Sequence, residues 1–127
     1  MLSQFVEYIP PYAAKFINQN WPGKTTLIFK TLEFVPSEFT QNGTVAFRIP
    51  GAPELINTIE QNGFPVVTTS ANFSGEQPSS KNANIPQNFK DLVNYNCPAK
   101  INNDSNKKPR ASKIIDCTGP EPKIIRD

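Results

Sequence analysis

The sequence contains no histidine and only two cysteines among its 127 residues. Without histidine, a serine or cysteine nucleophile lacks the base that usually activates it, so the common Ser-His and Cys-His hydrolytic sites are excluded. The cysteines, Cys97 and Cys117, form no C-x-x-C pair and have no histidine with which to complete a zinc site. We therefore expect two reduced, partly buried thiols and no metal ligands from the protein.

Long apolar runs and a strong charge of one sign are also missing. No stretch approaches the roughly 20 apolar residues that a membrane-spanning helix needs. Residues 1–7 lack the basic and apolar regions of a signal peptide. The formal net charge of +2 is small for a protein whose main partner is a nucleic acid. These absences predict a soluble, cytoplasmic protein with no membrane partner.

What the chain does contain is enough for one core. A domain of this length buries about two thirds of the surface that its unfolded chain exposes. Hydrophobic residues make up 37% of the sequence, with nine Phe and one Trp. The thirteen Pro residues predict many turns and short helices. We find no internal repeat and treat residues 1–127 as one domain.

Hydrophobic patterns place the elements along the chain. They predict helices over residues 10–20, 53–62 and 89–93, with Leu55, Ile56 and Ile59 as the buried stripe of the second. Apolar, β-branched runs predict strands over residues 25–30, 44–49, 64–69, 99–101, 113–117 and 123–126. Helices and strands do not alternate strictly, so the sequence predicts an α+β fold with a twisted mixed β-sheet and short flanking helices.

Three features could carry chemistry. Residues 68–75 gather hydroxyl, amide and glycine residues after a predicted strand, where side chains and backbone N–H groups can bind an anion. Arg48 lies in a strand and could hold a carboxylate or phosphate through two parallel hydrogen bonds. Ser112 and Arg126 each adjoin an apolar strand. Taken singly, such features are more typical of a turn or a solvated strand face than of a ligand site, and residues 107–110 are typical of a solvated basic loop.

Taken together, these segments resemble the YrdC family. In order along the chain they are Trp21-Pro22-Gly23-Lys24-Thr25-Thr26-Leu27, Thr44-Val45-Ala46-Phe47-Arg48-Ile49-Pro50, Thr69-Ser70-Ala71-Asn72-Phe73-Ser74-Gly75, Ser112-Lys113-Ile114-Ile115-Asp116 and Ile125-Arg126. Family members read roughly W-P-G-x-x-T, V-A-x-R-x-P, S-A-N-x-S-G, S-T-[IV]-[IV]-D and [IL]-R. Each motif is weak alone, but five in order across nearly the whole chain are specific.

The resemblance implies an L-threonylcarbamoyladenylate synthase. This enzyme, a nucleotidyltransferase, converts ATP, L-threonine and bicarbonate to threonylcarbamoyl-AMP and pyrophosphate, and Mg²⁺ arrives with the nucleotide. Its product serves a separate tRNA threonylcarbamoyl transferase. Carried over by motif, the implied catalytic residues are Arg48 and Ser70. The implied ATP contacts are Thr44, Ser70, Asn72, Ser79 and Arg126, and the implied threonine contacts are Arg48, Thr68 and Ser112.

Three departures and two alternatives accompany this resemblance. The family's N-terminal third has no counterpart before Met1, Lys113 stands where the family usually has Thr, and the chain ends at Asp127 where the family usually continues. We therefore expect this chain alone to be a partial YrdC-like domain with little activity. One alternative is a non-catalytic module that binds double-stranded RNA. The other is the related carbamoyltransferase domain of hydrogenase-maturation proteins.

Overall fold

The computed structural model describes residues 1–77, 79, 84–96 and 112–127. It forms two compact units, Met1–Val67 with Ala111–Asp127, and Thr68–Arg110. The predicted strand at 99–101, the basic residues 107–110 and Cys97 lie outside the described residues. In the described part of the chain, no helix is both long and apolar enough to cross a membrane.

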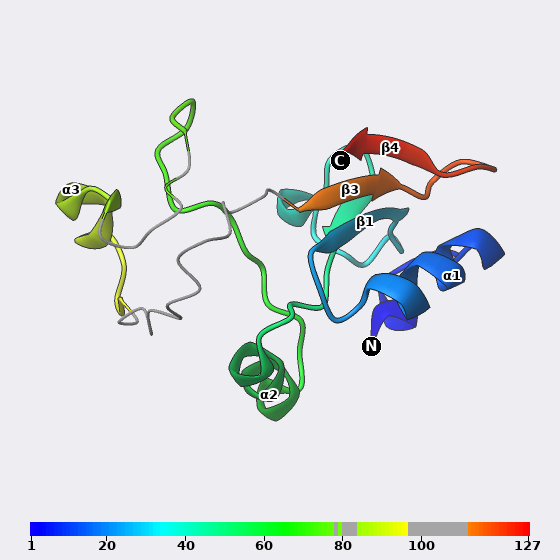
Figure 1. The fold of residues 1–127 in the computed structure, drawn as a ribbon, viewed down its shortest axis with the longest axis horizontal. Helices are drawn as coiled ribbons and strands as arrows, with labels where there is room; N and C mark the ends of the chain where they lie inside the picture. The colour runs from blue at the N-terminus through cyan, green and yellow to red at the C-terminus, as the bar shows by residue number, and fades with distance from the viewer. Residues whose placement is uncertain (78, 80–83, 97–111) are drawn as a thin grey trace. The chain divides into compact units, whose positions relative to one another are not determined.

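A four-stranded mixed sheet forms the centre of the first unit (Figure 1). Its strands are β1 (Thr25–Lys30), β2 (Thr44–Phe47), β3 (Lys113–Asp116) and β4 (Lys123–Arg126), and their order across the sheet is β2-β1-β3-β4. β1 is antiparallel to β2 and parallel to β3, and β3 is antiparallel to β4. The sheet thus joins two segments that are far apart in the sequence, and the predicted α+β fold on a mixed sheet is confirmed.

The described residues contain the α-helices α1 (Pro11–Asn20), α2 (Pro53–Asn62) and α3 (Gln87–Lys90), with short 3-10 helices at Leu2–Gln4 and Ser37–Phe39. Both α1 and α2 begin with proline. A backbone N–H in the first turn of a helix has no intrahelical acceptor, so a proline there costs no hydrogen bond. Gly63 ends α2 in the left-handed conformation with φ of 74°, which glycine adopts without strain.

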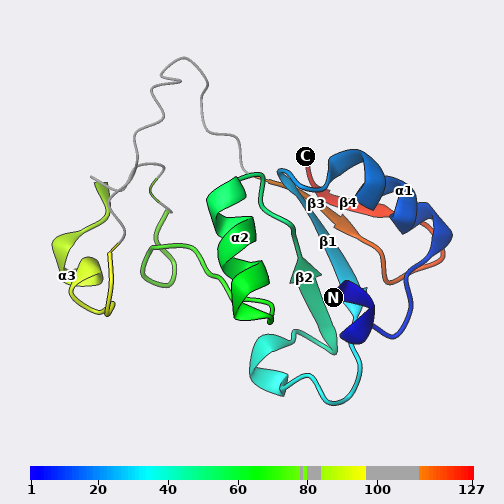
Figure 2. The same ribbon diagram turned by 90° about the horizontal axis from the view of Figure 1, so that it is seen from below.

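The core lies between α1 and one face of the sheet, and Figure 2 shows α1 alongside the strands. In β1, burial alternates because successive side chains point to opposite faces. The buried residues that meet on the packed face are Val6, Ala13, Leu27, Phe29, Ile115 and Cys117. Tyr12, Phe16 and Ile17 of α1 pack against them, as the helical spacing requires.

The sequence predictions and the structure differ in several places. Residues 64–69 form no strand and are exposed, because Pro65 lacks a donor and no described strand pairs with this segment. β2 ends at Phe47 rather than 49, and the third helix covers only Gln87–Lys90. The expected stripe of α2 is not buried, and Leu55 is 54% exposed. Local hydrophobicity therefore marked apolar segments correctly but did not identify what covers them.

Candidate functional site

The second face of the sheet carries the predicted arginines. We call it the open face, and its residues are Thr26, Ile28 and Lys30 of β1, Thr44 and Ala46 of β2 with Arg48 just beyond it, Ile114 and Asp116 of β3, and Arg126 of β4. The register of β1 with β2 and β3 assigns the residues of these strands to one face, since cross-strand partners point the same way. Arg126 lies opposite Ile114, next to a register shift in the β3–β4 pair. None of these side chains is buried. The polar and charged side chains of the open face are therefore accessible to a ligand.

Arg48 and Ser112 meet across the sheet although 64 residues separate them. The Nη1 group of Arg48 donates a hydrogen bond of 2.6 Å to Oγ of Ser112. β1 lies between β2 and β3, so the Arg48 side chain spans the width of β1 to reach its partner. The contact joins two residues to which the motifs assign the same ligand.

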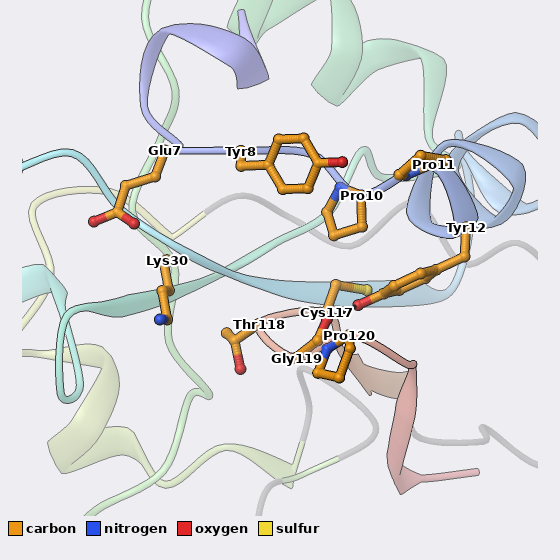
Figure 3. A pocket seen from close by; sticks show the side chains of 10 residues that line it. All are labelled: Glu7, Tyr8, Pro10, Pro11, Tyr12, Lys30, Cys117, Thr118, Gly119 and Pro120. Carbon is orange, nitrogen blue, oxygen red and sulfur yellow. Dashed lines mark hydrogen bonds between the residues drawn. The ribbon is translucent and has the colours of Figure 1, made fainter.

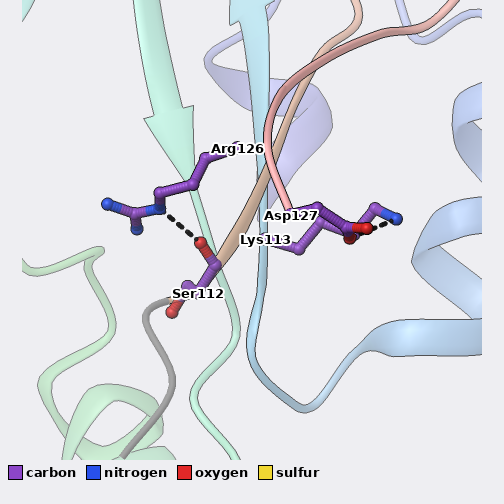
Figure 4. Close-up of polar contacts among 4 residues, drawn as sticks. All are labelled: Ser112, Lys113, Arg126 and Asp127. Carbon is purple, nitrogen blue, oxygen red and sulfur yellow. Dashed lines mark hydrogen bonds and ion pairs between the residues drawn. The ribbon is translucent and has the colours of Figure 1, made fainter.

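Arg126 also contacts Ser112, as Figure 4 shows. Its Nε group donates to the backbone oxygen of Ser112 at 2.8 Å. β4 pairs with β3, and Arg126 lies opposite Ile114 in the register. Ser112 therefore accepts from two guanidinium groups, through its hydroxyl and through its carbonyl.

The two arginines keep most of their hydrogen-bonding capacity. A guanidinium has five N–H donors, and the side-chain bonds described above use one from each. Neither guanidinium forms an ion pair with an acidic group within residues 1–77, 79, 84–96 and 112–127. Two cations near one serine create a positive potential that favours an anion. The arrangement is suited to a carboxylate or a phosphate.

The segment before β1 fixes the backbone around Arg48. The N–H of Gly23 donates to the carbonyl of Ile49 at 2.9 Å, directly after Arg48. A side chain at Gly23 would collide with the carbonyl oxygen of Asn20, so only glycine fits there. Nε1 of Trp21 donates to the carbonyl of Thr25 at 2.6 Å and holds the start of β1. These contacts explain why a Trp-Pro-Gly motif accompanies a distant arginine.

Thr44 lies at the far end of β2 from Arg48. Its hydroxyl donates to the carbonyl of Gln41 at 2.8 Å, and its register partner is Lys30. Four residues of strand separate the two side chains by about 13 Å. A ligand that contacts both must be extended along the strand.

The remaining predicted residues belong to the second unit, so their position relative to Arg48 and Ser112 stays a prediction. Thr68 and Ser70 are exposed. Nδ2 of Asn72 donates to the carbonyls of Phe73 and Glu76, each at 2.9 Å, and thereby closes the turn at 72–76. Oδ1 of Asn72 is buried without a partner in the described part of the chain. Oγ of Ser79 donates to the carbonyl of Asn84 at 3.1 Å.

A pocket of about 370 Å³ lies elsewhere in the first unit (Figure 3). It is lined by Glu7, Tyr8, Pro10, Pro11, Tyr12, Lys30, Cys117, Thr118, Gly119 and Pro120. The Tyr12 hydroxyl donates to the carbonyl of Gly119 at 2.6 Å, and burial raises the pKa of this phenol. Burial also raises the pKa of the Cys117 thiol to about 11. No predicted ligand-binding residue lines this pocket, and such a thiol is unsuited to nucleophilic attack at neutral pH.

Thr26, the threonine of the W-P-G-x-x-T motif, has no ligand role predicted from the sequence. Thr26 lies opposite Ile114, and continuing the β1–β2 register by one residue places Arg48 on its other side. The alternation of side chains along a strand predicts that Thr25 and Thr26 point to opposite faces of the sheet. Only the pairing of β1 with β2 and β3 places Thr26 between the two arginines. Within the described residues, no group of three or more acidic, cysteine or histidine side chains could hold a metal ion.

Comparison with known proteins gives a consistent result. A family model described as "Telomere recombination", for Sua5, YciO and YrdC, matches residues 1–127. A threonylcarbamoyl-AMP synthase of Klebsiella pneumoniae is 33% identical over 72 residues, which cover 56% of this chain and 38% of that protein. Another, from Marinobacter nauticus, is 28% identical over 100 residues, which cover 77% and 50%. The chain thus matches half or less of the length of these curated relatives.

Solved structures also match. Sua5 of P. abyssi, crystallised with L-threonine, matches with a TM-score of 0.79 and 26% identity, over 98% of this chain and 36% of that one. YciO of E. coli matches with a TM-score of 0.70 and 22% identity, over 99% and 60%. At that identity, the second match supports the fold alone.

Proposed function

Because the chain belongs to the Sua5/YciO/YrdC family, as its motifs predicted, we propose that it contributes a substrate-binding face to an L-threonylcarbamoyladenylate synthase. The proposed reaction consumes ATP, L-threonine and bicarbonate and releases pyrophosphate. Two observations on relatives support it. Curated relatives are named threonylcarbamoyl-AMP synthase, and a similar structure was determined with L-threonine.

The observation that carries the proposal is the meeting of Arg48 and Arg126 at Ser112. Threonine brings a carboxylate and ATP brings phosphates, so the substrates need two cationic groups that lie close together. Arg48 is the group proposed for threonine, and Arg126 is the group proposed for the nucleotide. Their shared partner keeps the two ligands near each other, as a reaction between them demands.

The proposed chemistry needs no protein nucleophile, which fits a chain without histidine. The threonine amine attacks bicarbonate, water is lost, and a carbamate forms. A carbamate oxygen then attacks the α-phosphorus of ATP, and the bond from that phosphorus to the pyrophosphate oxygen breaks. Catalysis of this kind depends on positioning and on stabilising charge at phosphorus. Arg126 would stabilise that charge, while Arg48 would hold the carboxylate.

The remaining residues are proposed for the same ligands. Thr44 would contact the nucleotide at the far end of β2, about 13 Å along the strand from Arg48. Thr68 would contact threonine, and Ser70 would contact the phosphates. Asn72 would support the turn at 72–76, through its two bonds to backbone carbonyls, and Ser79 would contact the nucleotide. Mg²⁺ would enter with the triphosphate as part of the substrate.

Calorimetric titration tests the proposal. L-Threonine and, separately, the Mg²⁺ complex of a non-hydrolysable ATP analogue are titrated into the 127-residue chain and into Arg48→Gln. Lys113→Gln is the matched control, because it removes the same charge from the opposite face of the sheet. We expect the unmodified chain and the control to bind both ligands, and Arg48→Gln to lose threonine binding.

Two results would contradict the proposal. One is an unmodified chain that binds neither threonine nor the nucleotide. The other is binding of double-stranded RNA without either ligand, which would favour a non-catalytic module. Pyrophosphate release is measured in parallel, and we expect it to be low for this chain alone, because the synthases it matches use a chain at least twice the length of the aligned part.

A further inference from the structure

Thr26 occupies the position between the two arginines of the open face. Its register partner in β3 is Ile114, which in turn lies opposite Arg126 in β4. On the other side, Leu27 pairs with Phe47, the last residue of β2. Arg48 follows Phe47 directly, and extending the register by one residue places it beside Thr26. One row across the sheet therefore reads Arg48, Thr26, Ile114 and Arg126.

The Arg48 side chain must pass over β1 near this row. Neighbouring strands lie about 4.8 Å apart, so a side chain from β2 crosses roughly 10 Å to reach Ser112 beside β3. The hydrogen bond of 2.6 Å shows that it does so. A ligand held by the outer donors of Arg48 then lies above β1, within reach of a short side chain at Thr26.

The Thr26 hydroxyl is available to such a ligand. It has no hydrogen-bond partner within the described residues, and the side chain is only partly buried. Its neighbour Thr25 points to the packed face and is 6% exposed. Strand propensity explains a β-branched residue at either position, but it does not require a hydroxyl on the open face.

We propose that the Thr26 hydroxyl is a further ligand-binding group, which donates a hydrogen bond to the carboxylate or carbamate of the amino-acid substrate held by Arg48. This inference rests on the function proposed above. The Ser112 hydroxyl accepts from Arg48 through a lone pair and keeps its own proton to donate, so Thr26 would supply a second neutral donor beside it. Thr26 adds a neutral donor between two cations and so fixes the orientation of the anion.

The test uses four forms of the 127-residue chain, titrated with L-threonine and with the Mg²⁺ complex of a non-hydrolysable ATP analogue. Thr26→Val removes the hydroxyl but keeps the shape and the strand propensity. We expect it to weaken threonine binding about tenfold, the effect of losing one hydrogen bond to a charged group, with little change in nucleotide affinity. Thr26→Ser should retain affinity within about threefold. Thr25→Val, the matched control on the packed face, should bind as the unmodified chain does.

The outcomes separate this inference from the proposed function. If the unmodified chain binds threonine and Thr26→Val binds it equally well, the role of Thr26 is wrong and the proposed function stands. A loss confined to the nucleotide would place the hydroxyl at a phosphate and overturn the assignment. Equal losses for both ligands, accompanied by a lower melting temperature, would mean that Thr26 only supports the fold. Failure of the unmodified chain to bind threonine overturns both proposals.

Discussion

The two faces of the sheet differ sharply although the same strands build both. On the packed face, Leu27, Phe29 and Ile115 are at most 1% exposed. On the open face, the intervening residues Thr26 and Ile114 are only partly buried, and hydrogen-bonding groups approach from both edges. Alternation along a strand thus separates residues that stabilise the fold from residues that can bind a ligand. Substitutions on the two faces should have different consequences.

The largest effect should come from the packed face. Phe29→Ala removes a fully buried aromatic ring that packs against Phe47, with ring centroids 6.4 Å apart. We expect the free energy of unfolding to fall by about 3–5 kcal/mol, the usual cost of this truncation in a core. Urea denaturation followed by circular dichroism measures the change.

Ile28→Ala is the control for this comparison. Ile28 is adjacent in the strand but lies on the open face and is partly exposed. Its truncation should cost about 1 kcal/mol or less, since a partly exposed side chain loses less burial and leaves no closed cavity. Equal losses for the two variants would mean that the open face is covered as thoroughly as the packed face.

The next effect concerns binding rather than stability. Arg48→Lys keeps the charge but loses the planar fork that holds a carboxylate through two hydrogen bonds. We expect threonine binding to weaken by about 1.5–3 kcal/mol, or roughly ten- to hundredfold, with a much smaller change for ATP. Calorimetric titration of each ligand measures both affinities.

Two outcomes of that titration would change the assignment. Equal losses for threonine and ATP would indicate that Arg48 supports the fold or the nucleotide. Unchanged threonine affinity would leave Arg48 as a solvated residue of the open face, bonded to Ser112 alone.

The fold could be predicted well where local patterns sufficed. Residues 25–30 form the predicted strand because a β-branched, apolar run lies between turn signals. Residues 64–69 have a similar composition but form no strand, since a strand also needs a partner, and pairing is not encoded locally. Leu55 is exposed for a related reason, because helical spacing predicts an apolar stripe without specifying what covers it.

The candidate site was predictable by motif but not by geometry. Arg48, Ser112 and Arg126 belong to separate motifs, and taken singly each is more typical of a solvated residue than of a ligand contact. Their meeting depends on the parallel pairing of β1 with β3, which joins segments more than 80 residues apart. Thr26 lies in the W-P-G-x-x-T motif, but a ligand role for it depends on the pairing of Leu27 with Phe47, which brings Arg48 close to it.

Alkaline pH should weaken the packed face through Cys117. Burial raises the pKa of this thiol from 9.0 to about 11, with a smaller contribution from Asp116. The folded state therefore keeps the proton more tightly than the unfolded state does. The stabilising contribution is fully present below about pH 9 and is lost as the pH rises towards 11. Melting temperatures across this range measure the loss.

Cys117→Val isolates the contribution of the thiol. Tyr12 also has a raised pKa, caused first by burial, so the unmodified chain loses stability from both groups at high pH. The variant removes only the thiol and should show a shallower decline between pH 9 and 11. Identical slopes for the two proteins would assign the whole effect to Tyr12 or to other groups.

The smallest effect should come from Lys113, which adjoins Ser112 in the chain but lies on the packed side of the sheet, opposite Thr25 in β1. Its Nζ forms an ion pair of 2.9 Å with Oδ1 of Asp127, in which the Asp127 side chain is 80% exposed (Figure 4). Such exposed pairs contribute about 0–1 kcal/mol, and high salt weakens them further. Lys113→Thr loses the pair but gains a β-branched residue in a strand.

These opposing changes should leave the free energy of unfolding within about 0.5 kcal/mol of its original value, as for most surface substitutions. Threonine affinity should not change, because the Lys113 side chain does not share a face with Arg48. Denaturation at low and high salt, together with threonine titration, measures both quantities. A clear loss of threonine binding would contradict the comparison of the two faces. It would show that Lys113, the first residue of β3, contributes to the ligand site although it lies on the packed side.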